Sequence, residues 1–347
     1  VTNKILMIYS LGLILGIFCI SLLLNNFLSN DNFIISPAFI CILIAILYTN
    51  LFSLPKNNQL VLNFVINKIL RIGIALIGIG LSFNQILQYS LNSIILILFN
   101  IILVFVILIL IGKVFNLSKK LLILISMGTA ICGVTAVIAS STIIKSDKNE
   151  TGYAVGVVTL FGLFAVLCYP YLANYLFNDN NIQAGIFLGT SIHDTAQVSA
   201  AGLIYSETFS ANETLNSSMT IKLLRNSFLI IMIPVLAYYF NDSKSKNIKS
   251  SLKKFFPLFV LGFIALSIIR TLGDFYFIAT TFNENWSNLV FILKEISKYL
   301  ILLSMVALGL QIKLSNFKQL GLKPLLIGFI AALSVGVSSF IFLNFNI

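Results

Sequence analysis

The sequence predicts an all-α protein that crosses a membrane many times. Its 347 residues are 59% hydrophobic and only 10% charged, whereas a soluble domain carries about 25% charged residues. The mean hydropathy is +1.02. Apolar stretches of about 20 residues, the length that a helix needs to cross the hydrocarbon core, recur along the chain. The alternating segments of about ten residues that a transmembrane barrel needs do not occur.

Counting these stretches predicts eleven transmembrane helices, of which the weakest is rich in Gly, Ser and Thr. The expected spans lie at about 5–27, 34–53, 66–86, 92–112, 121–144, 152–177, 182–205, 218–240, 255–273, 288–311 and 323–345. The first is interpreted as a span because its apolar part is too long for a signal peptide and no cleavage site of small residues follows. Only short loops join the spans. We therefore expect residues 1–347 to form a single integral membrane domain, with approximate halves 1–177 and 182–347.

The charged residues predict the orientation of the chain. Eleven crossings divide the loops into two sets, and one set holds most of the basic residues: Lys4, Lys56, Lys113, Lys119, Lys120, Lys244, Lys246, Lys249, Lys253, Lys254, Lys313, Lys318 and Lys323. The other set contains Asp31, Glu207, Glu213, Asp274 and Glu284, with Lys145 and Lys148 offset by Asp147 and Glu150. The positive-inside rule places the basic set in the cytoplasm. The N-terminus is then inside and the C-terminus outside, and the net charge of +11 needs no nucleic acid to explain it.

The cysteine and glycine patterns argue against a cofactor. The cysteines at positions 19, 41, 132 and 168 all lie within apolar stretches and lack metal-ligand spacing. The chain has one His and no Rossmann or P-loop glycine pattern. We therefore expect no metal, no cofactor and no ATP-driven transport.

Two pairs of spans resemble each other. Ser36-Pro37-Ala38-Phe39 opens one span as Phe256-Pro257-Leu258-Phe259 opens another, and residues 75–81 end a span as residues 307–310 do. With eleven crossings the members of each pair run in opposite directions, which is typical of an inverted-topology repeat. Residues 127–136 and 188–196 are also alike. Those two spans are expected to run in the same direction and so to fall outside this symmetry.

The span at 121–144 carries small and hydroxyl residues in its middle, and we expect its helix to be interrupted near 128–135. The candidate substrate-binding residues are Gly128, Thr129, Cys132, Gly133 and Thr135. A half-helix that begins here would offer backbone N–H groups and a positive dipole end to an anion. The alternative is that small residues only let helices pack closely.

The span at 182–205 carries the single His and an Asp, and we expect its helix to be interrupted near 189–197. An Asp inside a span costs roughly 2.5–3.5 kcal/mol on insertion scales and usually marks a substrate or ion path. The candidate substrate-binding residues are Gly189, Thr190, Ser191, His193 and Gln197, and His193 with Asp194 are candidates for ion coupling. The alternative is a buried polar pair that only fixes helix packing.

The span at 218–240 begins with two basic residues. Lys222, Arg225 and Asn226 are three and four positions apart and therefore share one helix face. We expect these three residues to attract an anion or to pair with Asp194. The alternative is that the two cations extend to lipid phosphates.

These motifs together resemble a known family. Residues 128–133 with Thr135 resemble its ICG-S/T-A signature, residues 189–202 resemble its G-T-x-H-E/D-x-x-Q-V-x-A-A-G signature, and residues 222–225 resemble its K-L-x-R element. The family is the YeiH-like conserved membrane proteins, to which sulfate export is attributed, and the resemblance covers essentially the whole chain. Asp194 stands where Glu is common and Thr135 where Ser is common. Both keep the chemistry, although Asp reaches about one methylene less far.

The resemblance implies inverted repeats, interrupted helices and alternating access, as in the similar bile acid/sodium and cation/proton antiporter-like transporters. We predict a secondary transporter of the bacterial inner membrane that exports sulfate, sulfite or a related anion, coupled to a proton or ion gradient. Its partners would be the anion and the bilayer, and a homodimer would suit the architecture. A cation/proton antiporter that uses Asp194 is the alternative. An enzyme or scaffold is a third hypothesis, disfavoured because only Ser191 or Thr195 offers a nucleophile.

Overall fold

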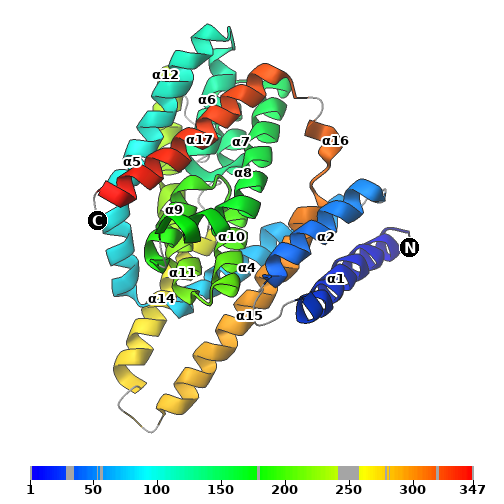
Figure 1. Ribbon diagram of the computed structural model, residues 1–347, viewed down its shortest axis with the longest axis vertical. Helices are drawn as coiled ribbons and strands as arrows, with labels where there is room; N and C mark the ends of the chain where they lie inside the picture. The colour runs from blue at the N-terminus through cyan, green and yellow to red at the C-terminus, as the bar shows by residue number, and fades with distance from the viewer. Residues whose placement is uncertain are drawn as a thin grey trace. The chain divides into compact units, whose positions relative to one another are not determined.

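The computed structural model describes residues 2–28, 35–52, 54, 58–177, 180–240, 258–277, 280, 282–317 and 320–345, and within these ranges the secondary structure is helical, with no strand. Seven helical stretches of this part are long and apolar enough to cross a membrane. The prediction of an all-α polytopic membrane protein is therefore confirmed. The chain divides into two compact units (Figure 1), and each unit takes segments from both halves of the sequence.

Unit 1 comprises residues 1–87, 199–216 and 258–314, and unit 2 comprises residues 88–198, 217–257 and 315–347. The helices that lie in unit 1 are α1 (Thr2–Leu28), α2 (Pro37–Leu51), α3 (Asn58–Phe64), η1 (Val65–Ile69), α4 (Leu70–Ile77), η2 (Gly78–Gly80), α14 (Leu258–Phe277) and α15 (Asn283–Leu310). Those in unit 2 are α6 (Lys119–Met127), η3 (Gly128–Cys132), α7 (Val134–Ile144), α8 (Lys148–Phe177), α9 (Asn181–Ser191), α12 (Leu229–Phe240) and α17 (Leu322–Phe345). Four helices have residues in both: α5 (Phe83–Val114), α10 (Thr195–Thr208), α11 (Asn212–Ser227) and α16 (Leu314–Phe317).

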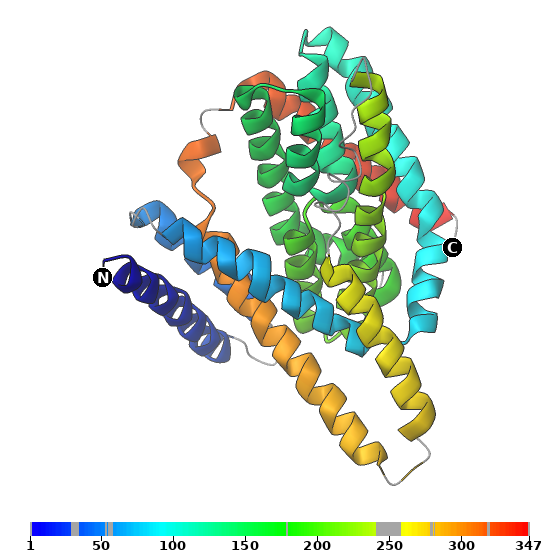
Figure 2. The same ribbon diagram turned by 180° about the vertical axis from the view of Figure 1, so that it is seen from behind.

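The segment at 119–144 is a hairpin that returns to the side it came from. Lys120, at its start, donates from Nζ to the carbonyl oxygen of Lys145, just past its end, over 2.8 Å. A straight helix would separate these residues by about 37 Å at 1.5 Å per residue. The helices α6 and α7 pack against each other and against α8 (Figure 2). We call this segment hairpin 1, and the prediction that 121–144 crosses the membrane is wrong.

The segment at 181–208 is a second hairpin, hairpin 2. The close neighbours of α11 advance along hairpin 2 in the direction in which α11 runs: Ser218 lies beside Gly189, Lys222 bonds Ile192, and Asn226 bonds Thr195. The helix α9 therefore approaches the turn parallel to α11. The helix α10 begins beside Asn226 and ends shortly before the first residue of α11, so it leaves antiparallel to α11. The prediction that 182–205 crosses the membrane is also wrong.

The two hairpins enter from opposite ends of α8. The base of hairpin 1 adjoins the start of α8, where Ser118 Oγ donates to Glu150 Oε1 over 2.5 Å. Hairpin 2 follows the last residue of α8, and the ring of Phe187 contacts those of Tyr169 and Phe177 at 5.4 Å and 5.6 Å. The hairpins therefore begin at opposite ends of a helix that is long and apolar enough to cross a membrane.

Because the two hairpins turn back, the chain has fewer expected crossings, and its charged loops are distributed differently between the two sides of the membrane. Without the two hairpins, nine of the eleven expected spans remain candidates for crossing the membrane in the described part of the chain. Seven satisfy length and apolarity; α2 is only 15 residues long, and α15 carries Lys294, Glu295 and Lys298 in its middle. Removing two crossings from the expected eleven leaves an odd number, so the expectation that the termini lie on opposite sides is unchanged. Removing them moves Lys145 and Lys148 to the side of Lys113, Lys119 and Lys120, which agrees better with the positive-inside rule.

Unit 1 contains the two pairs of similar spans, and their contacts match. The end of α4 meets α14, because a Cβ on Gly78 would overlap the carbonyl oxygen of Phe263. The end of α15 meets α2, because a Cβ on Gly309 would lie 2.8 Å from the carbonyl oxygen of Ile42. Exchanging α2 with α14 and α4 with α15 turns one contact into the other. This agrees with the inverted repeat expected from the sequence.

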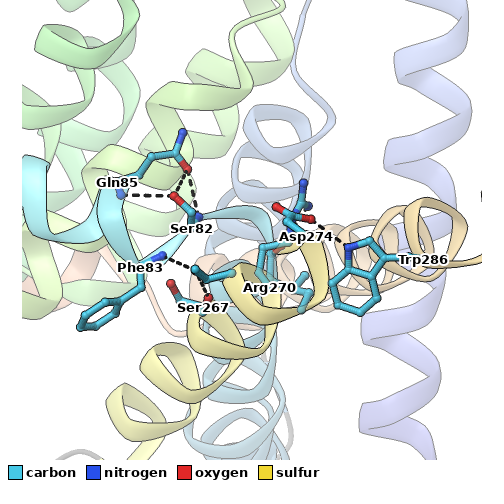
Figure 3. A network of polar contacts seen from close by, with 9 residues as sticks. Ser82, Phe83, Gln85, Ser267, Arg270, Asp274 and Trp286 are labelled. Atoms are coloured by element: carbon cyan, nitrogen blue, oxygen red, sulfur yellow. Dashed lines mark hydrogen bonds and ion pairs between the residues drawn. The ribbon is translucent and has the colours of Figure 1, made fainter. Parts of the chain in front are cut away.

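The turns that follow these two helix ends are also held alike. Arg270 of α14 donates to the carbonyl of Ile79 (3.4 Å), and Thr271 accepts from the N–H of Phe83 (2.8 Å). In the turn after α15, Asn50 of α2 donates to the carbonyl of Ile312 (2.9 Å) and accepts from the N–H of Leu314 (2.8 Å). Figure 3 shows the first turn, in which Asp274 joins Arg270 to the indole N–H of Trp286.

The two hairpins end in similar local turns. Hairpin 1 ends at Lys145 (φ 49°) with Ser146 N–H bonded to Ser141, and hairpin 2 ends at Ser210 (φ 54°) with Ala211 N–H bonded to Ser206. Because they begin at opposite ends of α8, the similar residues 127–136 and 188–196 fit the inversion after all. We interpret α2, α3–α4, α5, hairpin 1 and α8 as one repeat. Its partner is α14, α15, α17, hairpin 2 and α11–α12, in permuted order along the chain.

The hairpin topology makes a testable prediction about sidedness. In a variant without the four native cysteines, we expect Lys113→Cys and Lys148→Cys, which flank hairpin 1, to react with a membrane-impermeant maleimide from the same side. Asn180→Cys, at the other end of α8, should react from the opposite side. Labelling of the first two positions from opposite sides would show that residues 119–144 cross the membrane.

Candidate functional site

The turns of the two hairpins meet within unit 2. We call residues 128–135 tip 1 and residues 189–197 tip 2. Gly133 ends η3 with φ 67° and ψ −137°, a region that essentially only glycine occupies. A Cβ on Gly133 would lie 2.7 Å from Asp194 Oδ2 and 2.9 Å from Asp194 Cα. Tip 1 therefore needs glycine both for its backbone turn and for its contact with tip 2.

Lys222 joins the two tips from α11. Its side chain is fully buried, and its Nζ donates to three backbone carbonyls: Ile131 of tip 1 (3.1 Å), Ile192 of tip 2 (2.9 Å) and His193 of tip 2. An ammonium group has three N–H donors, so these carbonyls use all of them.

Arg225, one turn further along α11, joins the tips in the same way. It is 1% exposed, and its Nε donates to the carbonyl of Ala130 over 2.7 Å. The rest of its guanidinium donates to Thr129 of tip 1 and to Thr190 and Ile192 of tip 2. Because both cations are buried among backbone carbonyls, the interpretation that they extend to lipid phosphates is wrong.

Charge at the tips matches the polarity of four helix ends. The carbonyl ends of η3 and α9, which are the negative ends of their dipoles, face Lys222 and Arg225. The N–H ends of α7 and α10 are positive, and Asp194 lies at both. Its Oδ1 accepts from Ala196 N over 2.9 Å, and its Oδ2 adjoins Gly133. Two cations, Lys222 and Arg225, and one carboxylate, Asp194, therefore lie at the tips.

Gln197 joins tip 2 to α8. The residue of α8 that allows this close approach, Gly162, was not among those predicted from the sequence. Its Oε1 accepts from Asp194 N (3.2 Å), and its Nε2 donates to the carbonyl of Thr159 (3.3 Å). A Cβ on Gly162 would overlap the carboxamide of Gln197. A glycine inside a helix lowers its stability. A glycine among bulky apolar residues, as in Leu-Phe-Gly-Leu-Phe, therefore indicates that another segment packs closely against the helix there.

Three buried polar atoms in this region have no hydrogen-bond partner among the described residues: Ser191 Oγ, His193 Nδ1 and Asn226 Oδ1. Ser191 and His193 are each 1% exposed and Asn226 is 6% exposed. The amide of Asn226 donates to Thr195 Oγ1 over 2.9 Å. Since most buried polar side-chain atoms are hydrogen-bonded, the grouping of these three around tip 2 makes it the candidate site.

The structure brings the expected site residues together, although they differ in what they contact. Gly128 is closely approached by Val137 and Val158, and Gly189 by Ser218. Thr190 Oγ1 is bonded within its own helix, to Ile186 (2.8 Å). Cys132 is a buried free thiol, whereas Thr135 is exposed. In the described part of the chain, no three His, Cys, Asp or Glu side chains group as metal ligands do.

The turn at Gly133 predicts a pair of opposite mutational effects. Gly133→Ala should lower the free energy of unfolding by about 1–3 kcal/mol from backbone strain alone, with the contact against Asp194 adding to the loss. Gly152→Ala is the control, since Gly152 is helical with open space around it and Ala should stabilise by about 0.5–1 kcal/mol. Thermal denaturation in detergent measures both. Equal melting temperatures would argue against the tip contact.

Comparison with known proteins identifies the family. Residues 9–328 match the profile of the family described as conserved hypothetical protein 698. The UPF0324 membrane protein FN0533 of Fusobacterium nucleatum subsp. nucleatum is 31% identical over 283 residues, covering 80% of this chain and 82% of that protein. A UPF0324 membrane protein of Clostridium tetani is 32% identical over 294 residues, covering 81% of each chain.

A third relative matches over a longer range. The UPF0324 membrane protein PM1461 of Pasteurella multocida is 31% identical over 330 residues, covering 92% of this chain and 91% of that protein. These matches confirm the resemblance to YeiH-like proteins drawn from the tip motifs. The chain belongs to the conserved hypothetical protein 698 family of bacterial membrane proteins.

Proposed function

We propose that the protein is a secondary transporter that binds a small anion at the tips of its two hairpins. The observation that carries the proposal is the meeting of four helix ends around buried charges, reached by hairpins from opposite ends of α8. Transporters bind solutes near the membrane midplane at interrupted helices of this kind. The three unpartnered atoms around tip 2 supply polar contacts that a bound solute would complete.

The balance of charge favours an anion over a cation. With His193 counted as neutral, Lys222, Arg225 and Asp194 leave one positive charge in excess at the tips. Lys222 and Arg225 are engaged by backbone carbonyls. They would therefore act on the anion mainly through their field, while N–H groups of α7 and α10 and the Ser191 hydroxyl would touch it. We also propose that the anion contacts Thr135 directly.

The identity of the substrate and its coupling rest on the family resemblance. We propose a sulfur oxyanion such as sulfate or sulfite, or a short sulfonate, exported across the bacterial inner membrane with an N-terminus inside and a C-terminus outside. His193 and Asp194 would couple the movement to a proton or ion gradient, and the protein would catalyse no covalent step. A homodimer in the bilayer is part of the proposal.

One observation favours the alternative of a cation/proton antiporter. Asp194 is a carboxylate at the contact between the tips, where its Oδ2 adjoins Gly133. In that alternative Asp194 would carry the cation or the proton. The two hypotheses differ in which ligand stabilises the protein and in which variant loses the effect.

Ligand-induced stabilisation of the purified protein tests the proposal. We expect sulfite, sulfate or a short sulfonate to raise the melting temperature. A ligand at 100 times its dissociation constant stabilises by about 2.7 kcal/mol. His193→Ala and Ser191→Ala should lose the shift. Ser141→Ala should keep it, because the Ser141 hydroxyl donates to the carbonyl of Ile138 within α7, outside the tips.

The outcomes separate the hypotheses. An anion shift that survives in both tip variants would place the anion elsewhere. A shift with sodium or with pH alone, lost in Asp194→Asn, would support the antiporter. If none of these ligands changes the melting temperature, the tips are not a binding site for them.

A further inference from the structure

Unit 1 contains a basic cluster around the end of η2. Arg270 of α14 donates to the carbonyl of Ile79 over 3.4 Å. The next residue, Gly80, adjoins Lys294 of α15, because a Cβ on Gly80 would lie 3.3 Å from Lys294 Cε. The same Cβ would lie 3.3 Å from the side-chain oxygen of Asn216, in the first turns of α11. Two neighbouring backbone positions therefore bring two cations and a carboxamide together.

The positive charge of this cluster is only partly balanced. Asp274 Oδ2 accepts from Arg270 Nε over 2.7 Å, and its Oδ1 accepts from the indole N–H of Trp286 over 2.8 Å (Figure 3). A guanidinium has five N–H donors, and the described residues bond only two of those of Arg270. Lys294 is exposed, and no described residue forms a hydrogen bond or ion pair with its ammonium group. One positive charge and several N–H donors are therefore available to a ligand.

The matching turn of the inverted repeat has neutral side chains at the same positions. Counted from the two glycines of the matched contacts, Gly80 corresponds to Gln311 and Lys294 corresponds to Asn63. Gln311 Nε2 donates to Asn63 Oδ1 over 2.9 Å, so that turn is closed by a neutral side-chain pair. The arginine likewise takes the place of the neutral Asn50. The turn after η2 therefore differs from its counterpart in carrying two cations, and in having no side chain at residue 80 to bond the lysine.

We propose that Arg270, Lys294 and Asn216 form a binding site for a phosphate group. A guanidinium binds phosphate oxygens through parallel hydrogen bonds, and an ammonium group adds a point charge. Basic sites between membrane helices bind the headgroups of anionic lipids. Large apolar side chains are exposed on the same two helices, among them Phe275 and Phe291, and they would contact the acyl chains. The expected source of the phosphate is therefore an anionic phospholipid, while free phosphate has the same recognition chemistry.

The chain contains its own reporter for this site. Trp286 is the single tryptophan of the sequence, and it bonds the same carboxylate, Asp274, that holds the arginine. The probes are phosphatidylglycerol with two octanoyl chains, dioctanoylglycerol, which lacks the phosphate, and inorganic phosphate, all at constant ionic strength. We expect a saturable change in tryptophan fluorescence of the purified protein with phosphatidylglycerol. Dioctanoylglycerol should cause no such change.

Lys294→Gln is the variant that disturbs the fold least. It removes the cation that has no described partner and leaves the hydrogen bonds among Arg270, Asp274 and Trp286 in place. We expect the apparent affinity for phosphatidylglycerol to fall about fivefold, the loss that one basic residue near an anionic lipid surface produces. Lys68→Gln is the matched control, because Lys68 is another exposed lysine of unit 1, and it should keep the wild-type affinity.

Gly80→Gln is the second variant. It places beside Lys294 the side chain that the counterpart turn has at Gln311, and it should also weaken binding. A response to phosphatidylglycerol alone would assign the site to a lipid headgroup, and an equal response to inorganic phosphate would show that the phosphate group suffices. The site is overturned if neither the fluorescence nor the melting temperature responds to either phosphate compound. An equal response to dioctanoylglycerol, or an unchanged affinity in Lys294→Gln, would overturn it as well.

The test also separates this site from the proposed anion site at the hairpin tips. His193→Ala, a tip variant, should keep the response to phosphatidylglycerol. Lys294→Gln should keep any stabilisation by sulfite. Either site can therefore fail its own test without deciding the other.

Discussion

The structure depends on holding four helix ends together inside a membrane. Each interrupted helix leaves unpaired carbonyls on one side of the break and unpaired N–H groups on the other, and hydrocarbon offers them no partner. Lys222 and Arg225 donate to carbonyls of both tips, and Asp194 accepts from the N–H of Ala196 at the start of α10. Breaking a buried charged contact of this kind costs about 3–5 kcal/mol. The fold of unit 2 and the chemistry of its centre therefore rest on the same three side chains.

This arrangement also limits what the two cations do. A buried cation that is saturated by carbonyls has no donor left for a ligand, yet its charge still acts on the surroundings. In the proposed transporter, the ligand would instead contact atoms that have no partner among the described residues, which are Ser191 Oγ, His193 Nδ1 and Asn226 Oδ1. The cations therefore hold the tips together, while the polar atoms without a partner would be the ones that bind a ligand.

The sequence predicted the helical membrane fold, and it placed the candidate site residues in the two segments whose turns meet, because both leave local signals. Apolar stretches give the spans, and polar residues within such stretches give the tips. It did not predict that residues 119–144 and 181–208 turn back. A hairpin and a crossing helix have the same composition, and what separates them is long-range: Lys120 meeting Lys145, and α11 running beside α9. The charges of Lys145 and Lys148 were a usable signal, since they suit the cytoplasmic side only if hairpin 1 returns.

The repeat is symmetric in backbone but not in charge, and this bears on how the molecule moves. Aligning Lys148 of α8 with Asn212 of α11 places Val158 opposite Lys222 and Phe161 opposite Arg225. Both cations therefore belong to one repeat, and each of them bonds both tips. Moving one hairpin away from the other would break hydrogen bonds between its backbone carbonyls and a buried cation. In the proposed transporter, access from the two membrane faces would therefore be achieved more easily if α11 and the two tips moved as one body than if either hairpin opened alone.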